Sequence, residues 1–258
     1  PGLTLAIDEI ENFEMAMETG QAAIRSFIED EPVDPNFTEI DHPDVLLWAV
    51  WAIQQYSKVA SKEKCREKYG ELLEDIMDFI RKEKHDNLFL HDNGLLYSNG
   101  KDKAITWMNS TVNGHPVTPR TGYIVEFNAL WYNAIMYAIE VARDKNDMKF
   151  VKSFSAFSEK VRNSFNEVFV NGYGYLYDNV DGNYINWSVR PNMIFAVSVD
   201  YSPLDRKVAK SVLDIVTKEL LTPKGLRGLS PKSEGYSPYY IGDQLQKDYA
   251  SMNGTAYP

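Results

Sequence analysis

Three charged side chains could bind a ligand or form salt bridges with one another. Two of them lie at the beginnings of expected helices, and the third lies in the connector before one of these helices. Arg120 carries a planar guanidinium, which can grip a carboxylate through two parallel hydrogen bonds. Its alternative role is a salt bridge that anchors a loop. Asp44 and Glu126 each fall in the first turn of an expected helix, where a carboxylate complements the helix dipole. Residue type and position alone leave a structural role and a ligand-binding role open for all three.

Other kinds of reaction chemistry lack a sequence signal. Zinc sites need closely spaced histidine and cysteine ligands, and that spacing is absent among His42, His85, His91 and His115. No glycine-rich GxxxxGK[ST] loop is present to cradle phosphates, and nothing signals a Ser-His-Asp arrangement. We therefore expect no metal site and no cofactor.

The composition narrows the possible partners and the compartment. The net charge is -10 and 44% of the residues are hydrophobic. An acidic surface repels nucleic-acid phosphates, so we expect no nucleic acid. The longest apolar run, Val45 to Ile53, is far shorter than the roughly 18 residues of a spanning helix, so we expect no membrane span. The single cysteine, Cys65, cannot pair within the chain, which favours a reducing compartment such as the cytoplasm.

Helices with two kinds of apolar pattern must position these side chains. Residues 45–53, 125–143 and 191–200 are apolar over most of their circumference, which predicts helices buried on nearly all sides. Residues 8–29, 62–83, 147–169 and 204–221 are apolar on one face only. The alternation is typical of two concentric helical layers. It predicts an all-α fold of the toroid kind, incomplete at both ends, as a single domain over residues 1–258.

The connectors are long and rich in aromatic residues. Gly172 to Trp187 reads as a short hairpin with a turn at Asp181-Gly182. Residues 86–108 and 221–249 are also long. Because long ordered connectors are often binding loops, we expect part of the functional site on them.

The segment Thr106–Ala134 (TWMNSTVNGHPVTPRTGYIVEFNALWYNA) resembles the glucosidase domain of bacterial glycogen-debranching enzymes, the amylo-α-1,6-glucosidase family. That family's pattern runs roughly TWMDA, then PVTPR, then VEINALWYNAL. Further similar motifs follow the family's order along the chain: Pro1–Leu3, Asp44–Trp48 (DVLLW), Asn93–Ser98, Arg190–Asn192, Leu221–Leu229 and Asp248–Pro258. The resemblance implies an (α/α)6 barrel acting on α-glucans such as glycogen, limit dextrin and maltooligosaccharides.

The resemblance also implies a reaction, and the chain departs from it at one position. Such enzymes hydrolyse an α-1,6 glucosidic bond with inversion, using a carboxylic acid and a carboxylate base about 6.5–9.5 Å apart. The family's acid falls at Asn109, and an amide has no transferable proton. The base is expected beyond Pro258. Asp248 could bind a hydroxyl group or assist proton transfer, and a loop-structuring role is its alternative.

The resemblance further implies a set of substrate-binding residues. These are Asp44, Trp48, Trp107, Arg120, Glu126, Asn128, Trp131, Arg190, Asn192 and Asn253. Glu126 and Asn128 would bind sugar hydroxyl groups. Trp107 lies in a connector and suits a flat platform for a sugar ring, whereas the helical spacing of Trp131 is more typical of the core.

Two alternatives to an α-1,6-glucosidase stay open. Asn109 is compatible with a non-catalytic α-glucan-binding domain. The toroid also hosts other sugar enzymes, such as trehalase-like hydrolases and epimerases, because a fold does not determine a function.

Overall fold

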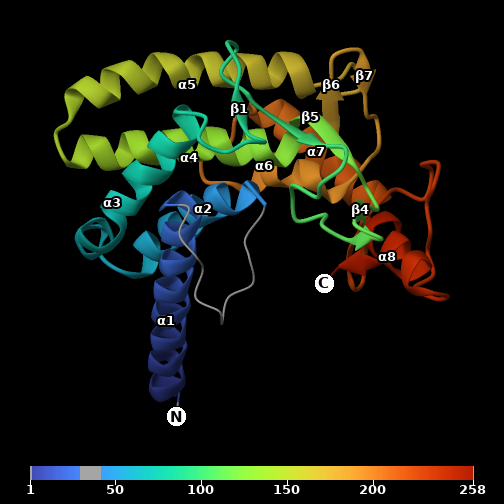
Figure 1. Ribbon diagram of the computed structural model, residues 1–258, viewed down its shortest axis with the longest axis horizontal. Helices are drawn as coiled ribbons and strands as arrows, with labels where there is room; N and C mark the ends of the chain where they lie inside the picture. Colours follow the sequence, from blue (N-terminus) through green and yellow to red (C-terminus); the bar gives the residue numbers. More distant parts are fainter. Residues whose placement is uncertain (1, 30–41, 258) are drawn as a thin grey trace.

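The computed structural model describes residues 2–29 and 42–257, and these are largely helical, with 54% of residues in helices (Figure 1). The helices are α1 (Gly2–Glu29), α2 (Asp44–Val59), α3 (Lys62–Arg81), α4 (Val125–Asp144), α5 (Met148–Phe169), α6 (Phe195–Ser198), α7 (Arg206–Glu219) and α8 (Gln244–Asn253). A 3-10 turn, Pro191–Ile194, leads into α6. Pro32 and Pro35, which follow the expected helix over residues 8–29 in the sequence, lie outside the described residues.

The helices pair along the chain as α2–α3, α4–α5 and α6–α7. The first members pack against one another, with α4 between α2 and α6, and the second members cover them. Figure 1 shows α4 and α5 as two long helices side by side. Helix α4 is buried on most of its circumference, as its broad apolar stripe predicts. Closure of these layers into a toroid stays a prediction.

Helix α2 departs from the expectation that it is buried on all sides. Trp51 is 37% exposed, and Trp48 is only half-buried. Trp48 lines an open groove of about 640 Å³ between α1 and α2, together with Val45 and Ala52; Trp51 lies outside this groove.

The helix predicted over residues 191–200 is also shorter than expected. After one turn of α6 the backbone becomes extended at Val199, with φ -65° and ψ 151°. This turn in the chain brings the Tyr201 backbone N–H to the side-chain oxygen of Asn133 on α4, at 3.1 Å. The Asp200 carboxylate is 2.6 Å from the ammonium of Lys58 in the last turn of α2. Contacts with neighbouring helices therefore replace the last turn of the predicted helix.

The all-α prediction is corrected by three small antiparallel sheets among the described residues. The largest has the order β1-β2-β5-β6-β7, built from β1 (Phe89–Leu90), β2 (Leu96–Gly100), β5 (Arg120–Ile124), β6 (Asn179–Asp181) and β7 (Tyr184–Ile185). The others pair β3 (Thr111–Val112) with β4 (His115–Pro116), and β8 (Leu221–Thr222) and β10 (Ala256–Tyr257) with β9 (Gly225–Arg227). Most of these strands have only two or three residues, too few to show the alternating pattern by which a strand is recognised. The five-residue strands β2 and β5 do alternate in burial, but Ser98, Arg120 and Gly122 occupy buried positions, so their hydrophobicity does not alternate.

The five-stranded sheet joins two distant connectors beside the start of α4. Strand β5 leads directly into α4, and Tyr123 and Ile124 of β5 pair with Val180 and Asn179 of β6. Gly122 makes this approach possible: its φ is +103°, and a Cβ atom there would lie 2.1 Å from the Val180 carbonyl oxygen. Residues near 120 and 178 are thereby held next to one another.

The hairpin predicted in Gly172–Trp187 is confirmed, with its turn one residue later than expected. Asp181 pairs with Tyr184, which leaves Gly182 and Asn183 as the turn residues. Gly182 has φ 57°, the left-handed conformation that a tight hairpin turn requires at that position.

Candidate active site

The guanidinium of Arg120 is the centre of a buried charged network. Arg120 lies at the first residue of β5 and is 4% exposed. It donates two parallel hydrogen bonds to the carboxylate of Glu126, one of them 2.7 Å long, in the first turn of α4. Its other side donates to both carboxylate oxygens of Asp178, at 3.0 and 3.1 Å. One arginine therefore holds two carboxylates that are each 1% exposed.

Asp178 links the network to the turn before α6 and, through that turn, to the connector that carries Trp107. The side-chain amide of Asn192 donates to the Asp178 carboxylate at 2.7 Å. In turn, the Asn192 carbonyl oxygen accepts the indole N–H of Trp107 at 3.0 Å. Asp178 also caps α4 from outside, because its backbone oxygen accepts the Val125 N–H at 3.1 Å. The hydrogen bond from its indole N–H to Asn192 orients the half-buried Trp107 ring.

Asp44 lies at the edge of the network, at the start of α2. Its carboxyl accepts hydrogen bonds from the Trp48 indole at 3.2 Å and from the backbone N–H of Trp107. It is 5% exposed and is close enough to Glu126 for their charges to interact. The carboxyl of Asp44 therefore contacts the indole of Trp48 and the backbone of Trp107.

A second guanidinium lies next to the first. Arg190 approaches the Asp178 carboxylate at 3.8 Å. It also donates to the Met252 carbonyl oxygen at 2.9 Å and to the side-chain oxygen of Asn253 at 2.8 Å. Arg190 thus ties the C-terminal end of α8 to the network.

The balance of charge in the network leaves one carboxyl without an arginine. Arg120 and Arg190 face Asp178, Glu126 and Asp44, and only Asp44 has no guanidinium on it in the described contacts. Burial, reinforced by the charge of Glu126, raises the pKa of Asp44 from 3.8 to about 7. Burial also raises the pKa of Glu126, against the opposing charge of Arg120. Burial alone would lower the pKa of Arg120, but Asp178 and Glu126 raise it, so the guanidinium stays charged.

The comparison with known proteins decides the family. A family model described as amylo-alpha-1,6-glucosidase matches residues 6–258. The chain belongs to this family. The glycogen debranching enzyme of Saccharomyces cerevisiae is 22% identical over 267 residues, which cover 88% of this chain and 17% of that protein. The chain thus spans a minor part of the length of this relative.

Eight of the residues that the family resemblance singled out lie in or next to the network. They are Asp44, Trp48, Trp107, Arg120, Glu126, Arg190, Asn192 and Asn253. They come from α2, two connectors, β5, the start of α4, the turn before α6 and the end of α8. A roughly thirty-residue motif and three scattered short ones therefore meet at one place.

The structure places the other two substrate-binding candidates in contacts with backbone. Asn128 is fully buried, and its side chain pairs with both the N–H and the carbonyl oxygen of Leu96, at 2.7 and 3.0 Å. Trp131 is fully buried in the core and donates its indole N–H to the Gly94 carbonyl oxygen at 3.1 Å. Asn128 therefore holds the first residue of β2 against α4, and Trp131 holds the connector between β1 and β2.

Neither candidate for proton transfer has a hydrogen bond to a buried carboxylate among the described contacts. Asn109, at the position of the family's acid, is exposed on the connector between β2 and β3. Asp248 is half-buried on α8, where its carboxylate accepts a hydrogen bond from Gln244 at 2.8 Å. A catalytic role for either position stays a prediction.

Sequence reasoning missed Asp178 and Thr106. Asp178 is bonded to Arg120, Asn192 and, more distantly, Arg190, yet it lies in a connector without helical periodicity. The only available signal was the prediction that the aromatic connector 172–187 is a binding loop. The Thr106 hydroxyl accepts a weaker contact from Arg120 at 3.4 Å.

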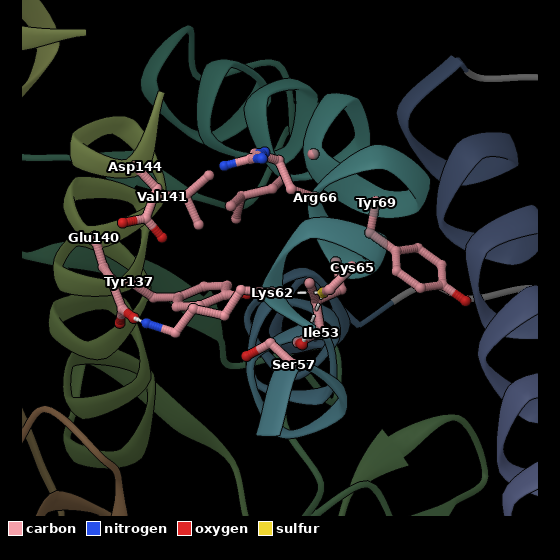
Figure 2. Close-up of a pocket in the computed structure, with 12 residues that line it drawn as sticks. Ile53, Ser57, Lys62, Cys65, Arg66, Tyr69, Tyr137, Glu140, Val141 and Asp144 are labelled. Atoms are coloured by element: carbon pink, nitrogen blue, oxygen red, sulfur yellow. Dashed lines mark hydrogen bonds and ion pairs between the residues drawn. The ribbon is translucent and has the colours of Figure 1, made fainter. Parts of the chain in front are cut away.

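One solvent-open pocket of about 390 Å³ lies apart from the network, between α2, α3 and α4. Lys62 pairs with Glu140 across it (Figure 2). Burial raises the pKa of the Cys65 thiol on its wall, so the sulfur stays protonated and is a poor nucleophile. We assign no site to it. Among the described residues, no group of His, Cys, Asp and Glu could hold a metal ion, and no helix is long and apolar enough to cross a membrane.

The pKa of Asp44 predicts that the protein loses stability as the pH rises. The folded-state pKa of about 7 exceeds the unfolded value of 3.8, so between these pH values the folded state holds more protons. The free energy of unfolding should then fall by about 2–3 kcal/mol between pH 5 and pH 8, at 1.36 kcal/mol per pKa unit. Urea unfolding across this range measures it. Asp44→Asn is the control and should show a flatter dependence; a wild-type stability that is constant or rises with pH would contradict the assignment.

Proposed function

We propose that the chain acts in a glycoside hydrolase that removes α-1,6-linked glucose stubs from glycogen or limit dextrin. One observation carries the proposal: family motif residues from segments far apart in the sequence converge on the Arg120–Glu126–Asp178 network. A buried ion-pair network with a purely structural role would not need half-buried tryptophans at its edge. Trp48 and Trp107 provide such an edge beside Asp44.

In this proposal the tryptophans and Asp44 hold the terminal glucose unit. Flat aromatic faces suit the C–H faces of a pyranose ring, and the carbonyl oxygen of a carboxyl group accepts a hydrogen bond from a hydroxyl group even when the group is protonated. Arg120 contacts other protein groups on all sides, so its role is to position Glu126 and Asp178. Asn192 fixes the Trp107 ring through its indole N–H.

The proton for the leaving oxygen has to come from a carboxylic acid. Asn109 has none to give, and Asp44 has a pKa of about 7, which suits a general acid at neutral pH. We assign the proton to Asp44. An inverting reaction would also need a carboxylate that activates water from the opposite face of the sugar, and we assign none among the described residues.

The finer features of the proposal follow from the family. The helical layers are part of an (α/α)6 toroid and belong to a single domain. Because glycogen is stored in the cytoplasm, the protein acts there on glycogen, limit dextrin or maltooligosaccharides.

A second candidate function, α-glucan binding without hydrolysis, is favoured by the exposed amide of Asn109 at the family's acid position. The same network would hold the glucan, but no bond would break. Calorimetry with maltooligosaccharides, run beside an assay for released glucose, separates the two functions: binding with no glucose release would favour this one.

Glucose release from a limit dextrin that carries single-glucose stubs tests the first proposal. The full-length protein should release glucose at neutral or mildly acidic pH. Absence of release at high enzyme concentration would reject it.

A further inference from the structure

A cluster of aromatic side chains is exposed on the connector that carries Asp178. It consists of Tyr173, Tyr175, Tyr177 and Trp187, and we call it the aromatic patch. Tyr173 is 79% exposed and Trp187 is 46% exposed. Large apolar side chains that gather on a surface often mark a binding site. The network described above uses none of these rings.

The rings of the patch are in contact with one another. Tyr173 and Tyr175 are nearly parallel, with ring centroids 6.4 Å apart and 21° between the planes. Trp187 meets Tyr173 at 6.1 Å and Tyr177 edge-on at 4.6 Å. The patch therefore offers flat faces in more than one orientation over neighbouring positions.

The backbone under the patch is held by hydrogen bonds at each step. The Asn171 side chain accepts the N–H groups of Tyr173 and Tyr175, at 2.9 and 3.3 Å. The Tyr177 N–H bonds to the Phe169 oxygen at the end of α5. A preformed surface of this kind loses little conformational entropy when a ligand binds.

Side chains of this connector point alternately inward and outward. Leu176 and Asp178 are buried at 0% and 1% exposure, and Asp178 serves the network. Tyr175 and Tyr177 lie on the other side and are half-buried. Packing of the loop explains Tyr177, which meets Trp187 closely, but it does not explain why Tyr173 stays open to solvent.

We propose that the aromatic patch is a second glucan-binding surface, which holds an outer chain of a branched α-glucan away from the buried network. The ligand class follows from the chemistry of the patch. Tyrosine and tryptophan present an apolar face and a polar tip, which matches the C–H face and hydroxyl rim of a glucose unit. The patch carries no charged side chain, so it is not suited to a polyanion. The inference rests on the proposed function for its choice of an α-glucan.

A surface of this kind should act on large, branched substrates in particular. Glycogen presents many chains at once, so a second contact on the same particle raises the apparent affinity through effective concentration. A short oligosaccharide that fills only the network gains nothing from the patch. Binding of glycogen therefore tests the aromatic patch together with the network, whereas a short oligosaccharide tests the network alone.

The test compares Tyr173→Ala, Trp187→Ala and the double variant with the unmodified full-length protein. The control is Tyr239→Ala, because Tyr239 is the same residue type with a similar exposure of 71%. Mobility in gels containing glycogen measures the affinity for the polymer, and glucose release from a short oligosaccharide with one α-1,6-linked glucose measures the network. Thermal unfolding of each variant verifies that it is folded.

We expect the double variant to bind glycogen about tenfold more weakly or worse, since avidity gains of this kind reach 10²–10⁴. Tyr239→Ala should bind like the unmodified protein, and release from the short substrate should stay unchanged in all variants. Equal glycogen affinity of the folded double variant and the unmodified protein would overturn the inference, as would binding to a protein partner that needs the patch while glycogen binding does not. Patch-dependent glycogen binding by a protein that releases no glucose would support the inference and reject the proposed hydrolysis.

Discussion

Replacing Arg120 by leucine should lower the free energy of unfolding by about 3–5 kcal/mol, the usual cost of removing one partner from a buried ion pair. Arg120 neutralises two carboxylates, Glu126 and Asp178, which are each 1% exposed. Without it, both must either stay charged in a poorly hydrated interior or take up protons. The effect should be among the largest of any single substitution in the chain. Chemical denaturation at pH 7 measures it.

The matched control is Lys210→Ala. Lys210 also pairs with a carboxylate, that of Asp214, but the two side chains are 73% and 64% exposed. Solvent screening limits such a pair to about 0–1 kcal/mol. Arg120→Lys should fall between the two variants, because an ammonium keeps the charge but cannot form the two parallel hydrogen bonds. If Arg120→Leu is no more destabilising than Lys210→Ala, the network is not the buried ionic centre that we describe.

Replacing Asp44 by asparagine should reduce glucose release from a stubbed limit dextrin by about 100-fold or more. A positioned general acid contributes typically 10²–10⁴-fold to a rate, and an amide cannot supply the proton. The loss should appear in kcat, because the hydrogen bonds that hold the sugar are partly kept by an amide of the same shape. Release by the unmodified protein should also decline above pH 7, as the Asp44 carboxyl ionises.

Two further variants make the Asp44 prediction specific. Asp214→Asn changes an exposed carboxylate and should leave glucose release unaltered. Asn109→Asp restores a carboxyl at the family's acid position. If Asn109→Asp raises release while Asp44→Asn leaves it unchanged, the proton donor belongs at position 109 and the assignment to Asp44 is wrong.

The long helices could be predicted from the sequence because each buries one continuous apolar face. The expected ranges 62–83 and 147–169 correspond to α3 (Lys62–Arg81) and α5 (Met148–Phe169). The prediction was less successful where contacts with other segments decide the backbone. Residues 191–200 have the right apolar content for a helix, yet only one turn of α-helix forms before the chain turns toward α4. Helix α8 was not expected, since few of its residues are buried.

The sequence predicted which residues belong to the candidate site better than it predicted which of them contact one another. Motif order along the chain identified Arg120, Glu126 and Arg190, but nothing in their spacing showed that one arginine holds two carboxylates. That fact depends on Asp178, which reaches Arg120 only because strands β5 and β6 pair. Strand β6 has three residues, and β5 places Arg120 and Gly122 at buried positions, so neither shows a hydrophobic alternation and their pairing could not be foreseen.

The most direct test of the central claim is the release of glucose from a limit dextrin with single α-1,6-linked glucose stubs, measured with the full-length protein at pH 6 to 7. A linear maltooligosaccharide and trehalose serve as comparison substrates. The account predicts release from the stubbed dextrin and little from the linear chain or trehalose, with the new glucose appearing first as the β-anomer, because the reaction inverts. No release from the dextrin at high enzyme concentration, or release from trehalose instead, would contradict it.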